Sequence, residues 1–208
     1  MLGFYNYTVW LTFASLATGV LGIGLTCAGH PLGGIICLVI CGLCDTFDGR
    51  IARTRTKSTV EEKRFGIQLD SLCDLVCFGV LPTTIGYAAG LRAWYFFPVF
   101  ILYVLAAMIR LAFFNIGAEE RVTDQNNRTV GYLGLPVTMV SLILPFVYLL
   151  HRLMPAVAFP FVYGGALLVI AAAFVCKWLH VPKPGAKEIL IMLSIGLLEF
   201  VALLIWGM

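Results

Sequence analysis

Residues 31–53, PLGGIICLVICGLCDTFDGRIAR, begin as an apolar run that suits a membrane helix and end in aspartates and arginines. A second apolar stretch, FGIQLDSLCDLVCFG at 65–79, carries two further acids. The four aspartates are Asp45, Asp48, Asp70 and Asp74. An ionised carboxylate inside a membrane helix costs at least a few kcal/mol, so the stretches indicate a membrane helix pair that carries a functional site.

The composition around these stretches is that of a membrane protein. Of the 208 residues, 61% are hydrophobic and 12% are charged, whereas about a quarter of a soluble domain is charged. Seven apolar runs have lengths near the roughly 20 residues that span a bilayer. They lie at about 8–29, 31–47, 67–90, 93–117, 133–150, 155–176 and 189–207. We therefore expect an all-α polytopic bundle of about seven transmembrane helices, forming one unit over residues 1–208.

The basic residues predict which way the bundle faces, because Lys and Arg of short loops stay in the cytoplasm. If the loop between the second and third helices is cytoplasmic, only Arg92 and Arg152 of the 14 basic residues lie outside. The N-terminus and the four aspartates then face the cytoplasm. The net charge of +3 reflects this sidedness, and nothing in the sequence suggests a nucleic-acid partner.

The spacing of the acids predicts a metal site. Asp45 and Asp48 are three residues apart and Asp70 and Asp74 four apart, so each pair lies on one face of its helix. Carboxylate oxygens of two facing helices suit a hard divalent cation such as magnesium, manganese or calcium. Four acids allow two such ions, the usual arrangement for neutralising a pyrophosphate.

The residues beside the acids extend this site toward phosphate. Gly49 and Ala52 leave the helix face bare next to Asp48, and Arg53 offers donors matched to phosphate oxygens. Gly66, one turn before Asp70, clears the opposite helix in the same way. Acids, small residues and an arginine together predict a pocket for a metal-chelated phosphate.

At these positions the chain resembles the CDP-alcohol phosphatidyltransferases, whose motif is DxxDGxxAR followed by GxxxDxxxD. Every defining position is filled, by Asp45, Asp48, Gly49, Ala52, Arg53, Gly66, Asp70 and Asp74. The spacer of twelve residues, 54–65, is longer than is common in that family. The resemblance implies a six-helix core to which a C-terminal helix is added, and it implies a homodimer.

Three further strings are similar to the serine-specific branch of the family, the phosphatidylserine synthases. They are LDSLCDLVCFGVLP at 69–82, IRLAFFNI at 109–116 and GYLGLP at 131–136. The resemblance implies transfer of a phosphatidyl group from CDP-diacylglycerol to L-serine, which yields phosphatidylserine and CMP. It also implies a requirement for Mn2+ or Mg2+, with two ions expected.

Carried over to this chain, the resemblance implies a role for each motif residue. Asp45, Asp48 and Asp70 would bind metal, and Asp74 would bind the second metal and act as the base. The CDP-diacylglycerol would be held by Asp48, Gly49, Ala52, Arg53 and Gly66. For the serine carboxylate we expect Arg110, with Asn115 beside it, although an arginine at a helix end can also simply reach the membrane surface.

Two other functions remain open on the sequence alone. One is the same transfer to a different alcohol, namely inositol, glycerol phosphate or choline. The other is a divalent-cation transporter, since acids in membrane helices also mark ion pathways. The crowding of the acids toward one membrane face, together with the DG and AR pairs, favours the enzyme.

The sequence also makes smaller structural predictions. Ser58 with Glu61, or Thr59 with Glu62, has the spacing of a capping box, so the third helix should begin near residue 60. The thiols of Cys41, Cys44, Cys73 and Cys77 offer an alternative metal site, but small cysteines more commonly serve close helix packing. Glu199 lies deep in the last apolar run and outside every motif.

Overall fold

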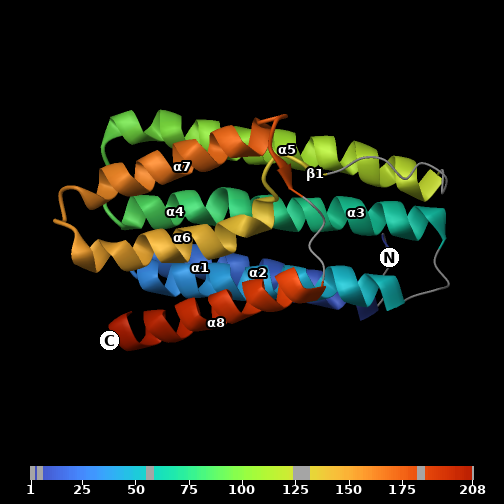
Figure 1. Cartoon of the computed structure of the whole chain (residues 1–208), viewed down its shortest axis with the longest axis horizontal. Coiled ribbons are helices and arrows are strands. Elements are labelled where there is room, and N and C mark those ends of the chain that lie inside the picture. Colours follow the sequence, from blue (N-terminus) through green and yellow to red (C-terminus); the bar gives the residue numbers. More distant parts are fainter. Residues whose placement is uncertain (1–2, 4–6, 55–58, 124–131, 182–185, 208) are drawn as a thin grey trace.

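The computed structural model describes residues 3, 7–54, 59–123, 132–181 and 186–207, and its long helices run along a common direction (Figure 1). In chain order the helices are α1 (Tyr7–Cys27), α2 (Pro31–Thr54), α3 (Val60–Asp74), η1 (Leu75–Val80), α4 (Leu81–Ala88), η2 (Trp94–Phe96), α5 (Phe97–Thr123), η3 (Val137–Met139), α6 (Val140–Leu149), η4 (Leu150–Leu153), α7 (Phe159–Val175) and α8 (Ala186–Gly207). Two short strands, β1 (Tyr132–Leu133) and β2 (His180–Val181), pair with each other in antiparallel fashion.

The helices have the length and composition of membrane spans. Within the described residues, three stretches are long and apolar enough to cross a bilayer, namely Val9–Cys27, Val60–Ala88 and Trp94–Glu119. Four shorter apolar helices accompany them at Pro31–Phe47, Val137–Leu153, Phe159–Val175 and Leu190–Ile205. These segments correspond to the seven predicted runs and confirm the polytopic helical bundle.

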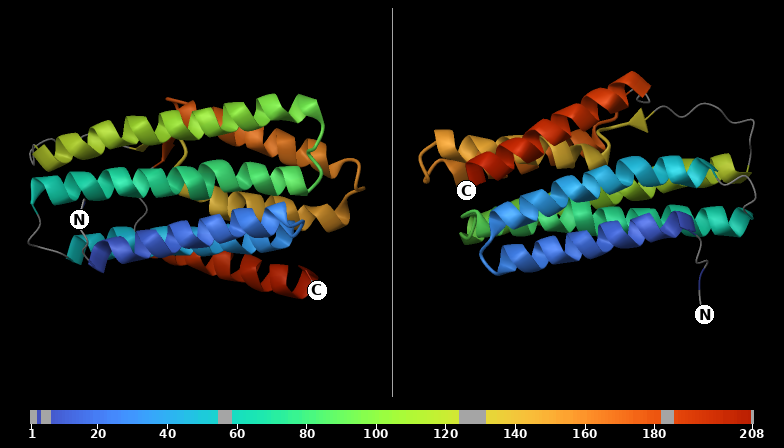
Figure 2. Two further views of the ribbon diagram at one scale, coloured as in Figure 1. Left: turned by 180° about the vertical axis from the view of Figure 1, so that it is seen from behind. Right: turned by 90° about the horizontal axis from the view of Figure 1, so that it is seen from below.

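The third span is one continuous helical rod made of α3, η1 and α4 (Figure 2). It begins where a capping box was expected. The Glu62 amide donates to the Thr59 hydroxyl and the Thr59 amide donates to the Glu62 carboxylate, both at 3.2 Å. These bonds satisfy two donors that a helix start leaves open. The pair is Thr59 with Glu62, whereas the alternative pair includes Ser58, which lies outside the described residues.

Cys41 and Cys77 take part in close helix packing. Cys41 and Cys77 donate to the main-chain carbonyl of Ser15, over 3.4 and 3.5 Å. A Cβ added at Gly19 would come within 2.6 Å of the Cys77 sulfur, so α1 approaches η1 closely only because this position is glycine. Contacts of this kind are how membrane helices associate in lipid.

The rod contains a π-helical segment, η1, immediately after the second acid of α3. Pro82 follows it and has no N–H, so it cannot bond the carbonyl of Phe78 four residues earlier. The hydroxyl of Tyr103, on α5, donates to this carbonyl over 2.8 Å. A neighbouring helix thereby satisfies a main-chain group that has no water to bond in the membrane.

Tyr103→Phe is expected to destabilise the fold. The side chain is fully buried, so the variant loses a hydrogen bond to the Phe78 carbonyl that no water can replace, at a cost of about 0.5–1.5 kcal/mol. Thermal unfolding in detergent measures the effect. Tyr87→Phe is the matched control because Tyr87 is 45% exposed, and equal stability of the two variants would contradict the assignment.

The apolar run predicted at 133–150 is only partly helical. Its first residues form β1 and a turn, and the helix begins at η3. Gly134 adopts a φ of +79°, a backbone conformation that ends regular structure and favours glycine. Pro136 then fixes the direction of the chain into η3. Two main-chain hydrogen bonds hold the turn in place. The Gly134 amide donates to the Leu179 carbonyl over 2.8 Å, and the Leu135 amide donates to the Ala173 carbonyl over 3.0 Å.

The last helix, α8, packs on α2 and α6. It places Glu199 in the interior, where the residue is 5% exposed. The Oε2 atom of Glu199 has no hydrogen-bond partner among the described residues. A close approach to α6 is made at Gly196, whose added Cβ would lie 3.3 Å from Leu142.

Candidate active site

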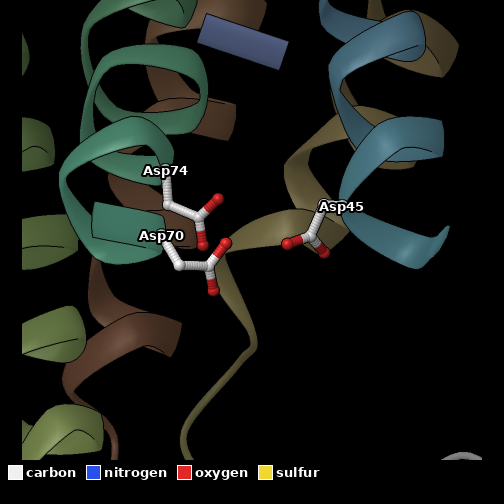
Figure 3. Close-up of side chains that lie close together, drawn as sticks. All are labelled: Asp45, Asp70 and Asp74. Atoms are coloured by element: carbon white, nitrogen blue, oxygen red, sulfur yellow. The ribbon is translucent and has the colours of Figure 1, made fainter. Parts of the chain in front are cut away.

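Three of the four predicted acids meet between α2 and α3. Asp45 comes from α2 and Asp70 and Asp74 come from α3, and one carboxylate oxygen of each lies within 4.8 Å of the other two (Figure 3). Asp45 and Asp70 are half-buried, whereas Asp74 is 8% exposed. The predicted convergence of the two helix faces is therefore confirmed for these three residues.

The donor set fits a hard cation. All three groups offer carboxylate oxygens, the ligands that Mg2+, Mn2+ and Ca2+ prefer. Like charges this close repel each other strongly in a medium with little water, so a cation between them would relieve the repulsion. Within the described residues this is the one group of three or more acids, cysteines or histidines that is close enough to bind a metal ion.

The structure describes only some of the remaining motif residues in full. Asp48, Gly49, Ala52 and Arg53 belong to the main chain of α2, but their side chains lie outside the described residues. Gly66 is described, and a Cβ built on it would meet no atom within 4 Å. Because Gly66 is one turn before Asp70 on the same helix face, open space borders the acids on this side.

A short stretch between α5 and α6, Gly134–Met139, lies beside the acids, and we call it the crossing strap. Its η3 turn contacts α2, α5 and η1, and in Figure 3 the ribbon of the strap passes close to the three carboxylates. Since η1 begins directly after Asp74, the strap joins the two walls that carry the acids. It forms a third side of the site.

Arg110 attaches the strap to α5. Its side chain is 6% exposed, and Nε donates to the Leu135 carbonyl over 3.3 Å. The guanidinium lies over the ring of Phe114 at 5.6 Å. The structure thus places the predicted serine-binding arginine behind the strap, where it holds the chain next to the acids.

Asn115 contacts α3 through the residue next to Asp70. Its Oδ1 accepts a bond from the Ser71 hydroxyl over 2.7 Å, and its Nδ2 donates to Gln68 Oε1 over 3.4 Å. Gln68 in turn donates to Glu119 over 2.6 Å. These four polar side chains tie α3 to α5.

The same four side chains line a groove of about 300 Å3 between α3 and α5. Gln68 and Leu72 on its wall are two residues from Asp70 and Asp74, which is about 200° around a helix. The groove therefore lies on the opposite face of α3 from the acids. It is separate from the metal-binding candidate, and Asn115 is bonded into the groove network.

Sequence reasoning missed two parts of this site. The run at 133–150 was expected to be a membrane span, but its first residues form the strap. The bonds from Gln68 and Ser71 to Asn115 were not foreseen. The glycine and proline of GYLGLP, in a run otherwise long enough to span the membrane, are the signal that could have revealed the strap.

Comparison with known proteins agrees with the motif. Residues 5–178 match the CDP-alcohol phosphatidyltransferase family. A CDP-diacylglycerol–serine O-phosphatidyltransferase of Saccharomyces cerevisiae is 32% identical over 153 residues, which cover 72% of this chain and 50% of that protein. One of the same name from Helicobacter pylori is 34% identical over 114 residues, covering 52% of this chain and 42% of that protein.

A third relative widens the comparison to archaea. An archaetidylserine synthase of Methanothermobacter thermautotrophicus is 29% identical over 142 residues, covering 67% of this chain and 56% of that protein. The chain spans about half the length of the curated relatives it matches. The family match ends at residue 178, before α8 begins. Because that match covers most of the chain and includes every residue of the acid motif, the chain belongs to the CDP-alcohol phosphatidyltransferase family.

Proposed function

We propose that this membrane protein transfers a phosphatidyl group from CDP-diacylglycerol to the hydroxyl of L-serine, giving phosphatidylserine and CMP. The observation that carries the proposal is the meeting of Asp45, Asp70 and Asp74 in a chain of this family. The choice of serine as the acceptor rests on the names of the relatives cited above, which are serine O-phosphatidyltransferases and an archaetidylserine synthase.

In this mechanism Asp74 is the general base. A serine hydroxyl is a poor nucleophile until a positioned carboxylate takes its proton, and Asp74 is the most buried of the three acids. The serine oxygen then forms a bond to the phosphorus that carries diacylglycerol. The bond from that phosphorus to the bridging oxygen breaks, and CMP leaves with the electron pair.

The acids would also hold the cation that binds the pyrophosphate of the substrate. A divalent cation, Mn2+ or Mg2+, held by Asp45, Asp70 and Asp74 would neutralise the charge that develops on the leaving phosphate. Asp48 is the fourth acid of the motif and would complete the ligands for a second ion. Arg53 would bind a phosphate oxygen of the CDP, and Gly49 and Ala52 would let the nucleotide approach α2.

Gly66 is proposed to face the bound CDP-diacylglycerol. Because no atom lies within 4 Å of an added Cβ, Gly66→Leu should leave the fold intact and fill the space needed by the substrate. We expect KM for CDP-diacylglycerol to rise about tenfold or more, the effect of losing ~1.4 kcal/mol of binding. Gly24→Leu is the control, since Gly24 also borders open space but lies on α1, and equal kinetics of the two variants would contradict the role of Gly66.

The acids are proposed to face the cytoplasm. Lys63 and Arg64 lie at the start of α3, whereas Arg92 and Arg152 lie in the turns at the other end of the bundle (Figure 1). The excess of basic residues on the α3 side follows the positive-inside bias. Labelling a cysteine introduced at Lys63, in a variant whose exposed Cys27 is replaced by serine, tests this orientation in intact cells. Reaction at position 63 with a membrane-impermeant reagent added outside would contradict it.

The reaction itself is tested with purified protein. CDP-diacylglycerol is incubated with serine, inositol, glycerol phosphate or choline, with and without Mn2+, and released CMP is measured. We expect release with serine and metal. Release with inositol alone would move the proposal to another alcohol, and divalent-cation uptake into vesicles without any CMP release would favour transport. The homodimer implied by the family resemblance stays a prediction.

A further inference from the structure

The crossing strap carries one hydroxyl that the motif does not include, that of Thr138. Thr138 lies in the middle of η3 and is half-buried. Its carbonyl accepts a bond from the Ser141 hydroxyl over 2.7 Å. The Thr138 hydroxyl itself makes no hydrogen bond with any of the residues that the structure describes.

Contacts of Ser141 place this hydroxyl near the acids. A Cβ added to Gly42 on α2 would collide with the Ser141 side chain, so these two residues face each other directly. The two helices run in opposite directions (Figure 1). Asp45 is three residues after Gly42, and Thr138 is three residues before Ser141. Moving from Gly42 to Asp45 along α2, and from Ser141 back to Thr138 along α6 and η3, leads in the same direction, toward the acid site. Thr138 therefore lies at about the same height along the bundle as Asp45.

The geometry of η3 directs the side chain to the same side as Ser141. The η3 turn continues directly into α6, and residues three apart on a helix share a face, so Thr138 lies on the same side as Ser141, toward α2. The η3 turn also contacts η1, which follows Asp74. The hydroxyl therefore lies between the helix of Asp45 and the helix of Asp74, at the side of the site that Arg110 holds through Leu135.

We propose that Thr138 is a specificity-determining residue whose hydroxyl donates a hydrogen bond to the carboxylate of the acceptor amino alcohol. The inference rests on the proposed transfer to serine. In serine the carboxylate is separated from the hydroxyl-bearing carbon by only one carbon atom, so an acceptor bound with its hydroxyl at Asp74 places its carboxylate against the wall of the site next to Asp74. Thr138 supplies a donor on the strap, where that carboxylate would lie.

Thr138→Val tests the inference, because valine keeps the shape of threonine and removes the hydroxyl. A hydrogen bond to a charged group contributes about 1.5–3 kcal/mol, so we expect KM for serine to rise about tenfold or more. The KM for CDP-diacylglycerol should stay within about twofold, a difference of ~0.4 kcal/mol. Thr138→Ser retains a hydroxyl and should restore much of the affinity for serine.

Thr84→Val is the matched control. Thr84 is also half-buried and donates to the Leu81 carbonyl over 2.8 Å, but it lies on α4, away from the acids. An unchanged KM for serine in Thr138→Val, or an equal rise for both substrates, would overturn the inference. Failure of the wild-type protein to release CMP with serine would instead overturn the proposed function, so the two failures are distinguishable.

Discussion

Asparagine in place of Asp74 is expected to lower kcat by about 10²- to 10⁴-fold, the usual contribution of a general base. The amide has nearly the size of the carboxylate but cannot take the proton of the acceptor hydroxyl. The KM for CDP-diacylglycerol should change little, because Asp45 and Asp70 remain in place beside it. The measurement is CMP release at saturating metal and both substrates.

A matched control separates catalysis from charge. Glu61→Gln removes one carboxylate from the same helix, α3, at an exposed position in its first turn, and kcat should stay close to that of the wild type. Wild-type turnover in Asp74→Asn would remove Asp74 as the base. The transfer would then need another proton acceptor.

Removal of divalent cations is expected to abolish turnover and to lower stability together. Three carboxylates whose oxygens lie within 4.8 Å of one another repel each other without a counter-ion. An ion that binds the folded state at a hundred times its Kd stabilises it by about 2.7 kcal/mol. Thermal unfolding with chelator, and then with added Mn2+ or Mg2+, measures this effect without any substrate.

The variant Asp70→Asn supplies the comparison for this experiment. It removes one of the three negative charges, so the stabilisation by Mn2+ should shrink strongly and the metal concentration for half-maximal activity should rise. Glu61→Gln is the control, because it removes a carboxylate from the same helix at an exposed position. Gln68→Glu is unsuitable, because Gln68 bonds Glu119. Full activity in the presence of chelator, or equal stabilisation of Asp70→Asn and wild type, would contradict the metal site.

Sequence alone predicted the acids because helix geometry is local. Residues three or four apart share a helix face whatever the rest of the fold does, and the cost of charge in lipid requires such faces to meet. The structure confirms this for Asp45, Asp70 and Asp74. The capping box at Thr59 was predictable for the same reason, since all of its bonds lie within four residues.

The parts that escaped prediction depend on contacts between distant segments. The strap at Gly134 is held by carbonyls of Ala173 and Leu179, and no local pattern reveals partners some forty residues away. The π-helical turn after Asp74 is stabilised by Tyr103 from α5, and its local sequence is as apolar as an ordinary helix. Only the packing of α6 on α2, where Ser141 faces Gly42, supports placing Thr138 near the level of Asp45.

The most direct test of the transfer to serine is a competition among acceptors. Purified protein with Mn2+ and CDP-diacylglycerol receives serine, inositol, glycerol phosphate and choline at equal concentrations, and the phospholipid products are identified by mass spectrometry beside the CMP released. We predict phosphatidylserine as the dominant product, in a one-to-one ratio with CMP. A different phospholipid as the dominant product, or no phospholipid at all, would contradict the account.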